Sequence, residues 1–570
     1  MRLLAIVFAL TAFLAAPSGA QPLPDALRSA GVTQAQWDAV RAQVRAEAQR
    51  ARISEASLLA AAEAASANLA ASGRFEPLAL QQAIYEALAE QADQIAELQR
   101  RLDALTGDAD PGIGGVFAQA RAALDEGRLA EADRLLADVA ARDLAAIQHA
   151  DAEAERRRLR AGETIASRGQ VALVQADHLI AAAHYARAAE IVPQTATEAR
   201  WQYTVWRGLA LYHRSRLFGE AESLNQAVGA YEAALDLRPR EHAAADWAAT
   251  QINLGNALQL QGERGARGAL ERAVAAFEAA LIVRTRDADP AGWARTQMNL
   301  GAALSILGER GAPGALERAV TAYEAALTVR TRDADPAGWA QTQVNLGNAL
   351  QRQSVRGARG ALERAVAAYQ AALTVMTREA DPTGWAMTQM NLGIALHRQG
   401  ERGAPGAPER AVAAFEAALT VRTRAADPVG WAQIQNNLGA TLRLQGARGA
   451  PGALDRAVAA YEAALTVRTR DADPAGWAQT QVNLGNALQL QGALERAVAA
   501  YQAALTVWTR EASPAGWAET TYNLALAYRA MGRVHDARAA AQGALDAFAQ
   551  VGNTNGANLA RALIAWLPPE

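Results

Sequence analysis

The side chains with the clearest capacity for chemistry are asparagines that recur along the C-terminal two-thirds of the chain. Each stands directly before a Leu-Gly or Leu-Ala pair in an alanine-rich segment. Asparagine is a poor helix former, and its amide offers both donors and an acceptor. A regular series of such amides predicts hydrogen bonding, either between repeats or to a ligand. The series is Asn253, Asn299, Asn345, Asn391, Asn437, Asn483 and Asn523.

A second polar row follows in the same segments. A further asparagine comes three residues later at Asn256, Asn348 and Asn486, and arginines come next at Arg352, Arg398 and Arg443. At these spacings the side chains share one face of a helix, and we expect them to form a peptide- or partner-binding groove with the first series. This neutral to mildly basic face suits an extended peptide or a partner helix. The alternative is an asparagine ladder that bonds neighbouring repeats to one another.

Other reactive groups are absent or isolated. None of the seven histidines recurs with the repeat or lies at a metal-ligand spacing from carboxylates. The chain has no cysteine, and all 56 basic residues are arginine, which excludes a thiol nucleophile, a Schiff base and a lysine phosphate loop. The sequence therefore predicts no catalytic residue, no cofactor and no metal.

Charge and hydropathy limit the partners further. The net charge of −3 provides no basic field for nucleic acid. Residues 3–16 form an apolar run that is too short to span a bilayer and precedes a small-residue cleavage site. We expect a signal peptide at residues 1–20, no membrane span, and a periplasmic or secreted bacterial protein.

A tryptophan recurs at one fixed step and reveals the elements that carry the asparagines. The first seven tryptophans of this series are each 46 residues apart, and the eighth follows after 40 residues. The series is Trp201, Trp247, Trp293, Trp339, Trp385, Trp431, Trp477 and Trp517. Residues 337–351 reappear letter for letter at 475–489. Such a period indicates a solenoid with one long concave surface in place of an enclosed pocket.

Each unit predicts two helices. Asp289 is expected to cap the first, with Pro290 at its first position, and Ser513 with Pro514 is expected to do the same in the last unit. Gly301 leaves room for the second helix, whose apolar stripe includes Tyr323. The bend between the helices carries an arginine in five units, and we expect it to be a solvated loop: Arg264, Arg310, Arg356, Arg402 and Arg448.

The Leu-Gly pair followed by Ala, then Tyr or Phe, then Ala resembles the tetratricopeptide repeat. Gly485 and Tyr501 are 16 residues apart, the family's spacing, and the other units have 22 because of an insertion such as 263–268. The family's tryptophan position holds glutamine here, as at Gln297. The resemblance implies an all-α, right-handed α-solenoid of helix hairpins over about residues 200–550. It also implies that the asparagines face a peptide-holding groove, although the basic residues of the chaperone-tail clamp are missing.

The remaining chain divides by composition. We expect a helical region at 21–106, a linker at 107–115, degenerate repeat-like helices at 116–200, about eight units at 201–550 and a C-terminal capping helix at 551–570. Apolar residues alternate steps of four and three through 84–105, from Ile84 and Leu88 to Leu102 and Leu105. This seam predicts either a coiled coil that forms a homo-oligomer or a helix that folds back on its own chain.

These features together predict a non-enzymatic protein–protein interaction scaffold. The partner is a protein or peptide bound in the groove of the solenoid. The alternatives are a hydrolase with a carboxylate site in the first 200 residues, or a purely structural oligomer.

Overall fold

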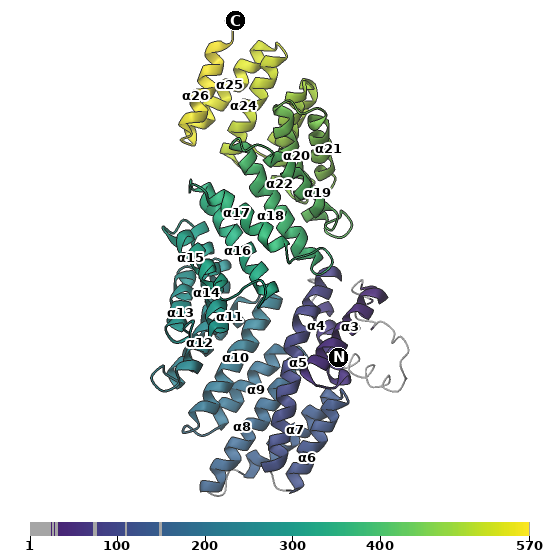
Figure 1. The fold of residues 1–570 in the computed structure, drawn as a ribbon, viewed down its shortest axis with the longest axis vertical. Helices are drawn as coiled ribbons and strands as arrows, with labels where there is room; N and C mark the ends of the chain where they lie inside the picture. The colour runs from purple at the N-terminus through teal and green to yellow at the C-terminus, as the bar shows by residue number, and fades with distance from the viewer. Residues whose placement is uncertain are drawn as a thin grey trace. The chain divides into compact units, whose positions relative to one another are not determined.

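The computed structural model describes residues 32–71, 77–108, 111–146 and 151–568, together with Pro24 and Arg28. The described residues hold 24 helices, and successive helices pair into hairpins (Figure 1). The predicted all-α fold of tetratricopeptide-like hairpins is confirmed. The signal peptide expected at residues 1–20 lies outside the described residues.

The chain divides into two compact units, at 1–284 and 285–570. In the first unit, three N-terminal helices precede four hairpins. The helices are α3 Gln34–Ala51, α4 Glu55–Ala71, α5 Pro77–Asp108, α6 Pro111–Asp125, α7 Leu129–Ala146, α8 Asp151–Val174, α9 His178–Ile191, α10 Thr197–Phe218, α11 Ala221–Leu237, α12 Ala244–Glu263 and α13 Ala269–Val283. The hairpins are α6–α7, α8–α9, α10–α11 and α12–α13.

The second unit holds six hairpins and one last helix. These are α14 Pro290–Glu309, α15 Ala315–Leu327, α16 Pro336–Val355, α17 Ala361–Leu373, α18 Pro382–Glu401, α19 Ala407–Leu419, α20 Pro428–Ala447, α21 Ala453–Leu465, α22 Pro474–Gln491, α23 Leu494–Leu505, α24 Pro514–Ala530, α25 Val534–Gln550 and α26 Thr554–Trp566. From α6 to α25 we call the even-numbered member of each hairpin its first helix and the odd-numbered member its second helix.

Aspartate caps position the first helices of the second unit. The Asp335 carboxylate accepts a bond of 2.9 Å from the Gly338 N–H, and Pro336 takes the first helical position. Asp289, Asp381, Asp427 and Asp473 act in the same way. In α24 the expected N-cap residue Ser513 and the proline at the first position are both present, but the Ser513 hydroxyl makes no bond to the helix, so the side-chain cap expected there is missing. The serine side chain is shorter than that of aspartate, and the Trp508 ring packs beside Gly516 in the first turn of α24.

A glycine on each first helix sets the distance to its second helix. A Cβ on Gly347 would lie 2.6 Å from the Tyr369 ring, which is itself fully buried. The same contact occurs at Gly255, Gly301, Gly393, Gly439 and Gly485. It also occurs between Gly169 and Tyr185, and between Gly208 and Tyr231. These two pairs identify α8–α9 and α10–α11 as hairpins of the same kind.

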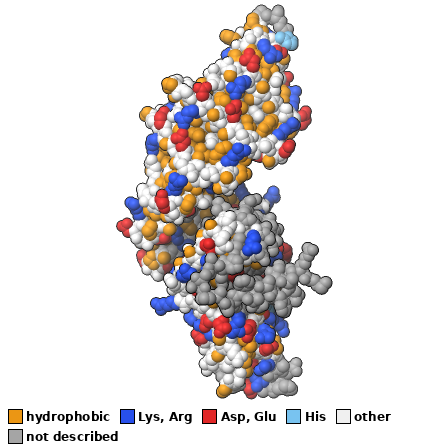
Figure 2. Space-filling view, turned by 90° about the vertical axis from the view of Figure 1, so that its right-hand side faces the viewer, with side chains coloured by type: hydrophobic (Ala, Val, Ile, Leu, Met, Phe, Trp, Pro, Cys, Tyr) orange, Lys and Arg blue, Asp and Glu red, His pale blue; other side chains and the backbone are white. Residues whose placement is uncertain are grey.

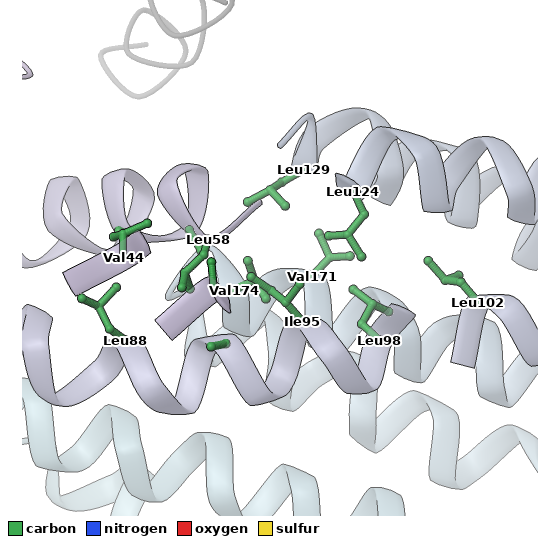
Figure 3. Close-up of a cluster of buried hydrophobic side chains, with 14 of the residues drawn as sticks. Val44, Leu58, Leu88, Ile95, Leu98, Leu102, Leu124, Leu129, Val171 and Val174 are labelled. Atoms are coloured by element: carbon green, nitrogen blue, oxygen red, sulfur yellow. The ribbon is translucent and has the colours of Figure 1, made fainter. Parts of the chain in front are cut away.

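The N-terminal helices form a core of their own with the first hairpins (Figure 3). On α5, Ile84, Leu88, Ile95, Leu98 and Leu102 are at most 2% exposed. They belong to one cluster with Val44 of α3, Leu58 of α4, Leu124 of α6 and Val171 of α8. The seam predicted at 84–105 is therefore covered by helices of the same chain, and the coiled-coil homo-oligomer prediction is wrong. Only the fold-back alternative agrees with this burial.

The region around the expected linker at 107–115 is mostly helical. Helix α5 continues to Asp108, and α6 begins at Pro111, where a proline is favourable at the first position. Residues 107–108 and 111–115 of the expected linker are therefore helical, and residues 109–110 lie outside the described residues. At the other end, α26 follows the last hairpin as a single helix.

The first tryptophan of the series lies where two successive hairpins meet. Trp201 is 9% exposed, and its indole N–H donates to the Thr250 hydroxyl of the next first helix at 3.0 Å. The other tryptophans of the series are half-buried. An arginine stacks over several of these rings, as Arg510 does over Trp517 at 5.4 Å from its centroid.

Candidate partner-binding surface on the first helices

Every asparagine of the predicted set lies on a first helix and is half-buried. In the second unit, successive first helices contact one another, so their asparagines lie on adjacent helices. We call this set the asparagine strip: Asn299, Asn345, Asn348, Asn391, Asn437, Asn483, Asn486 and Asn523. Asn253 and Asn256 occupy the same positions on α12 in the first unit.

Part of the strip forms a ladder between neighbouring repeats. The Asn391 amide donates to the Asn348 oxygen at 3.2 Å, and the Asn523 amide donates to the Asn486 oxygen at 3.2 Å. The Asn483 amide donates to Asn436, the residue before the predicted site, at 3.1 Å. The ladder interpretation thus describes real bonds in three of the junctions.

Tyrosines of the second helices reach the same amides. The Tyr369 hydroxyl lies 2.7 Å from the Asn348 oxygen and 3.0 Å from the Gln351 oxygen. Tyr501 repeats the arrangement with Asn486 and Gln489. Burial raises the pKa of both hydroxyls, so they remain protonated donors. Because a hydroxyl has one proton, the second amide must turn its NH2 toward the tyrosine oxygen.

The ladder leaves amide groups for a ligand. The Asn348 oxygen accepts from Tyr369 and Asn391, which fills both of its lone pairs, while no described residue accepts from its NH2 group. The Asn437 side chain has no bonding partner among the described residues. Asn345 bonds only to Gln341 of its own helix, at 3.2 Å. Half-buried amides with spare donors and acceptors can bind the backbone of a partner.

The three predicted arginines differ in their contacts. Arg352 forms an ion pair with Glu309 of the preceding first helix. Arg443 lies beside the Tyr461 hydroxyl and opposes the rise in pKa that burial causes there. Arg398 forms no ion pair with any described residue. All three side chains are half-buried beside the asparagine strip, so Arg398 and Arg443 keep charge available at this surface.

The loop arginines hold neighbouring repeats together, and the solvated-loop prediction is wrong. Arg402 donates to the Ser354 carbonyl at the end of the preceding first helix at 2.8 Å. Arg356 and Arg448 donate in the same way to the carbonyls of Gly308 and Gly400. In the first unit, Arg264 donates to the Ser215 carbonyl at 2.7 Å. The inserted bend therefore carries a charged cap for the last turn of a neighbouring helix.

The second helices are joined by ion pairs between consecutive repeats. Arg364 pairs with Glu324, Arg456 with Glu416, and Arg496 with Glu462. In the upper part of Figure 2, which shows one face of the second unit, arginines and carboxylates are dispersed among apolar side chains, with neither sign of charge gathered into a patch. Because the charges there are mutually compensated, we assign partner recognition to the first helices.

The structure shows little that suits other chemistry. Within the described residues, no group of three or more histidine, aspartate or glutamate side chains is arranged to hold a metal ion. None of the described helices is long and apolar enough to cross a bilayer. Burial lowers the pKa of His178 and of His213 to about 4, and the two rings stack with centroids 6.1 Å apart.

Sequence reasoning missed a cluster in the first unit. The Arg101 guanidinium lies 4.1 Å from the centre of the Trp206 ring and 3.2 Å from a Glu163 carboxylate oxygen. Glu163 also accepts from the Tyr203 hydroxyl at 2.5 Å. The sequence did contain one indication of this cluster. Trp206 stands two residues before Gly208, the position that asparagine holds relative to the glycine in later repeats.

Residues 477–514 match the sequence profile of the family described as tetratricopeptide repeat. No curated protein matches the sequence. Among solved structures, the apo form of RapI has 13% identity and a TM-score of 0.43, and the match covers 70% of this chain and 98% of that one. The Cut9–Hcn1 assembly of APC/C matches at 14% identity and a TM-score of 0.34, over 87% and 93%. MamA from Desulfovibrio magneticus matches at 20% and 0.26, over 37% and 97%.

Proposed function

We propose that this tetratricopeptide repeat protein is a non-enzymatic scaffold that binds a protein or peptide partner along the asparagine strip. The observation that supports the proposal most directly is the incomplete use of the strip by the fold. Asn345 and Asn437 bond to no neighbouring repeat, yet they stand in line with asparagines that do. A purely structural ladder has no need of an amide at those two positions, because asparagine lowers helix propensity.

The chemistry of the strip defines what it recognises. Amide groups bond equally to acceptors such as carbonyl oxygens and to donors such as N–H groups, so they suit either an extended peptide backbone or the polar side chains of a partner helix. Arg398 and Arg443 add positive charge, which favours a partner with carboxylates near the bound segment. Export to the periplasm or the outside of the cell belongs to the proposal as well, and its support is the apolar run at residues 3–16.

The test compares the open asparagines with a matched residue elsewhere. A display library of random-sequence peptides is selected on the full chain, and the affinity of the best binder is measured by fluorescence anisotropy. For Asn345→Ala with Asn437→Ala we expect about tenfold weaker binding, which corresponds to about 1.4 kcal/mol. Asn558→Ala on α26, where the amide faces only Arg561, serves as the control.

The variants also need unchanged folding. Since neither Asn345 nor Asn437 bonds to another repeat and alanine has the higher helix propensity, the thermal midpoint should be no lower than that of the unsubstituted chain. Equal affinity of all three proteins, or a selection that yields no binder, would contradict the proposal.

A further inference from the structure

In the first unit, the first-helix surface is already covered by a helix of the same chain. Gln91 of α5 donates to the Val174 carbonyl at the end of α8 at 3.5 Å. Arg101, ten residues further along α5, pairs with Glu163 in the middle of α8, eleven residues before Val174. Helix α5 therefore runs antiparallel to α8, with its polar side chains on that helix.

The same helix also runs antiparallel to the next first helix. Glu90 of α5 lies 3.2 Å from the His213 ring nitrogen in the last part of α10. Arg101 stacks on Trp206, seven residues earlier on α10. Two contacts on each of two neighbouring first helices fix the direction of α5. Helix α5 therefore lies across α8 and α10 in the way an amphipathic helix binds to a groove of another protein.

The positions that hold α5 correspond to the asparagine strip. Gly208 on α10 and Gly347 on α16 make the same contact with a tyrosine ring, so they set a common register. Trp206 stands two residues before its glycine, as Asn345 does. His213 stands five residues after its glycine, as Arg352 does. Within the second unit, the described helices that contact the equivalent surface are those of the hairpins themselves, and no added helix covers it there as α5 does in the first unit.

The chemistry of the α5 segment is acidic and amphipathic. Residues 84–105 contain five carboxylates and two arginines. One side carries the buried leucines and isoleucines, and the other carries Glu90 and Arg101. This chain therefore contains one example of a helix that binds across first helices.

The strip in the second unit offers complementary groups. Arg398 and Arg443 provide cations, and Arg352 is partly neutralised by Glu309. Three apolar side chains on the same helices are strongly exposed: Val355 at 64%, Met387 at 42% and Leu490 at 48%. Exposed apolar groups and cations on one set of neighbouring helices fit a helix with one apolar side and a row of carboxylates.

We propose that the asparagine strip of the second unit binds an acidic amphipathic helix of a partner protein, antiparallel to the first helices, as α5 binds in the first unit. The inference rests on the proposed function and specifies its partner. A helix satisfies its own backbone bonds, so the strip amides meet partner side chains, with carboxylates at Arg398 and Arg443.

The probe is a stapled, fluorescent peptide of residues 84–105, because this segment has the required chemistry and its own site in the chain is filled. Its affinity for the full-length protein is measured by anisotropy. Arg398→Ala with Arg443→Ala should weaken binding about tenfold or more. Arg410→Ala with Arg456→Ala removes the same charge from second helices and should leave the affinity unchanged.

A second peptide separates a helix from an extended ligand. It has the same sequence with Ala92→Pro and no staple, so it cannot form a continuous helix. We expect it to bind about tenfold more weakly than the stapled probe. Equal binding of both peptides would overturn the helix inference and leave the proposed function standing, since an extended chain would then occupy the strip.

Three further outcomes would also overturn the inference. If neither arginine pair affects the stapled peptide, its site lies away from the strip. If the stapled peptide does not bind while the random library yields a binder sensitive to Asn345→Ala with Asn437→Ala, the partner is not a helix. Light scattering during the titration must show one chain for each complex, because a doubled mass would identify a second copy as the occupant.

Discussion

At the scale of single residues, a few small side chains determine how closely the hairpins pack. Gly347 and its equivalents face an aromatic ring with no space for another carbon atom. The aromatic side chain fills the volume that a larger first-helix residue would take, and it is fully buried in Tyr369, Tyr461 and Tyr501. Packing at this density responds to the addition of a single methyl group.

The contact can be tested by adding that methyl group. In Gly347→Ala, the new Cβ would lie 2.6 Å from the Tyr369 ring, so the helices must separate or the ring must leave its rotamer. We expect destabilisation of about 1–3 kcal/mol, measured by chemical denaturation. Gly229→Ala on α11 is the control, since no atom lies within 4 Å of its Cβ position. That variant should be more stable, by about 0.5–1 kcal/mol, and destabilisation of both proteins would refute the packing argument.

The stacked histidines of the first unit predict acid sensitivity. Burial lowers the pKa of His178 and His213 to about 4, below the unfolded value of 6.5, and the neighbouring Arg214 and Arg216 add to this. The stability that they contribute is complete above about pH 6.5 and is lost as the pH falls toward 4, by about 3 kcal/mol per histidine. Burial raises the pKa of Glu90, so the folded chain binds a proton at this carboxyl more readily than the unfolded chain does. This uptake opposes part of the loss of stability as the pH falls.

The measurement is the thermal midpoint between pH 4 and pH 7. His178→Gln with His213→Gln should flatten the acid side of the curve, because the variant no longer has two neutral rings that the unfolded chain protonates more easily. His535→Gln, at an exposed position of α25, should leave the curve unchanged. A double variant as acid-sensitive as the parent would disprove the assignment.

At the scale of elements, the sequence predicted local structure better than contacts between distant segments. The Asp-Pro starts and the glycine–aromatic register follow from residues within one repeat, and the structure has both. The seam at 84–105 was ambiguous, because a heptad pattern shows that a helix needs an apolar partner and does not show which one. The partners Val44, Leu124 and Val171 lie far along the chain, so only the fold identifies them.

The loop arginines illustrate the same limit. The composition of the bend shows only that it is polar and glycine-rich. The bond from Arg356 to the Gly308 carbonyl joins residues 48 positions apart, so the local sequence does not reveal it. Whether such a side chain is solvated or bonded depends on the separation of two hairpins. The asparagine strip was partly predictable for the opposite reason, since its place on one helix face follows from spacing alone.

The inter-repeat bond predicts different effects for two arginines of one loop. Arg356→Ala removes the donor to the Gly308 carbonyl and should lower stability by about 1 kcal/mol, measured by urea denaturation. Arg359→Ala, three residues later, removes an exposed side chain that bonds to no described residue and should change stability little. Equal effects would show that the bond to the preceding hairpin adds nothing.

At the scale of the whole molecule, the stability of a repeat stack is a sum over repeats and their interfaces. Within the second unit, successive first helices are in contact at every junction. Loop arginines bond to the preceding hairpin from α16–α17, α18–α19 and α20–α21, and ion pairs between second helices join α15 to α17, α19 to α21 and α21 to α23. Gln370 replaces the glutamate that would pair with Arg410, and the hairpins α22–α23 and α24–α25 lack the inserted bend with its arginine. Since the links recur in register, complete hairpins should be exchangeable units.

Removal of one complete hairpin tests this directly. Deletion of residues 336–381 joins Asp335 to Pro382 and so restores the capped start of a first helix. Arg410 would then follow Glu324, the residue that now pairs with Arg364, and should form the equivalent ion pair. The Asn391 bond to Asn348 would be lost. We therefore expect a monomer with the same helical signal per residue and a modestly lower denaturation midpoint, by circular dichroism and light scattering.

Deletion of residues 336–360 alone is the matched comparison. It removes α16 but keeps α17, so the Tyr369 ring loses the glycine surface of its own hairpin and becomes exposed together with its apolar neighbours. The apolar surface of α17 that is exposed in this way promotes association between chains, so this variant should aggregate or lose helical signal. If both deletions behave alike, the hairpin is not the unit of stability. The asparagine strip would then have to be described as part of one indivisible unit.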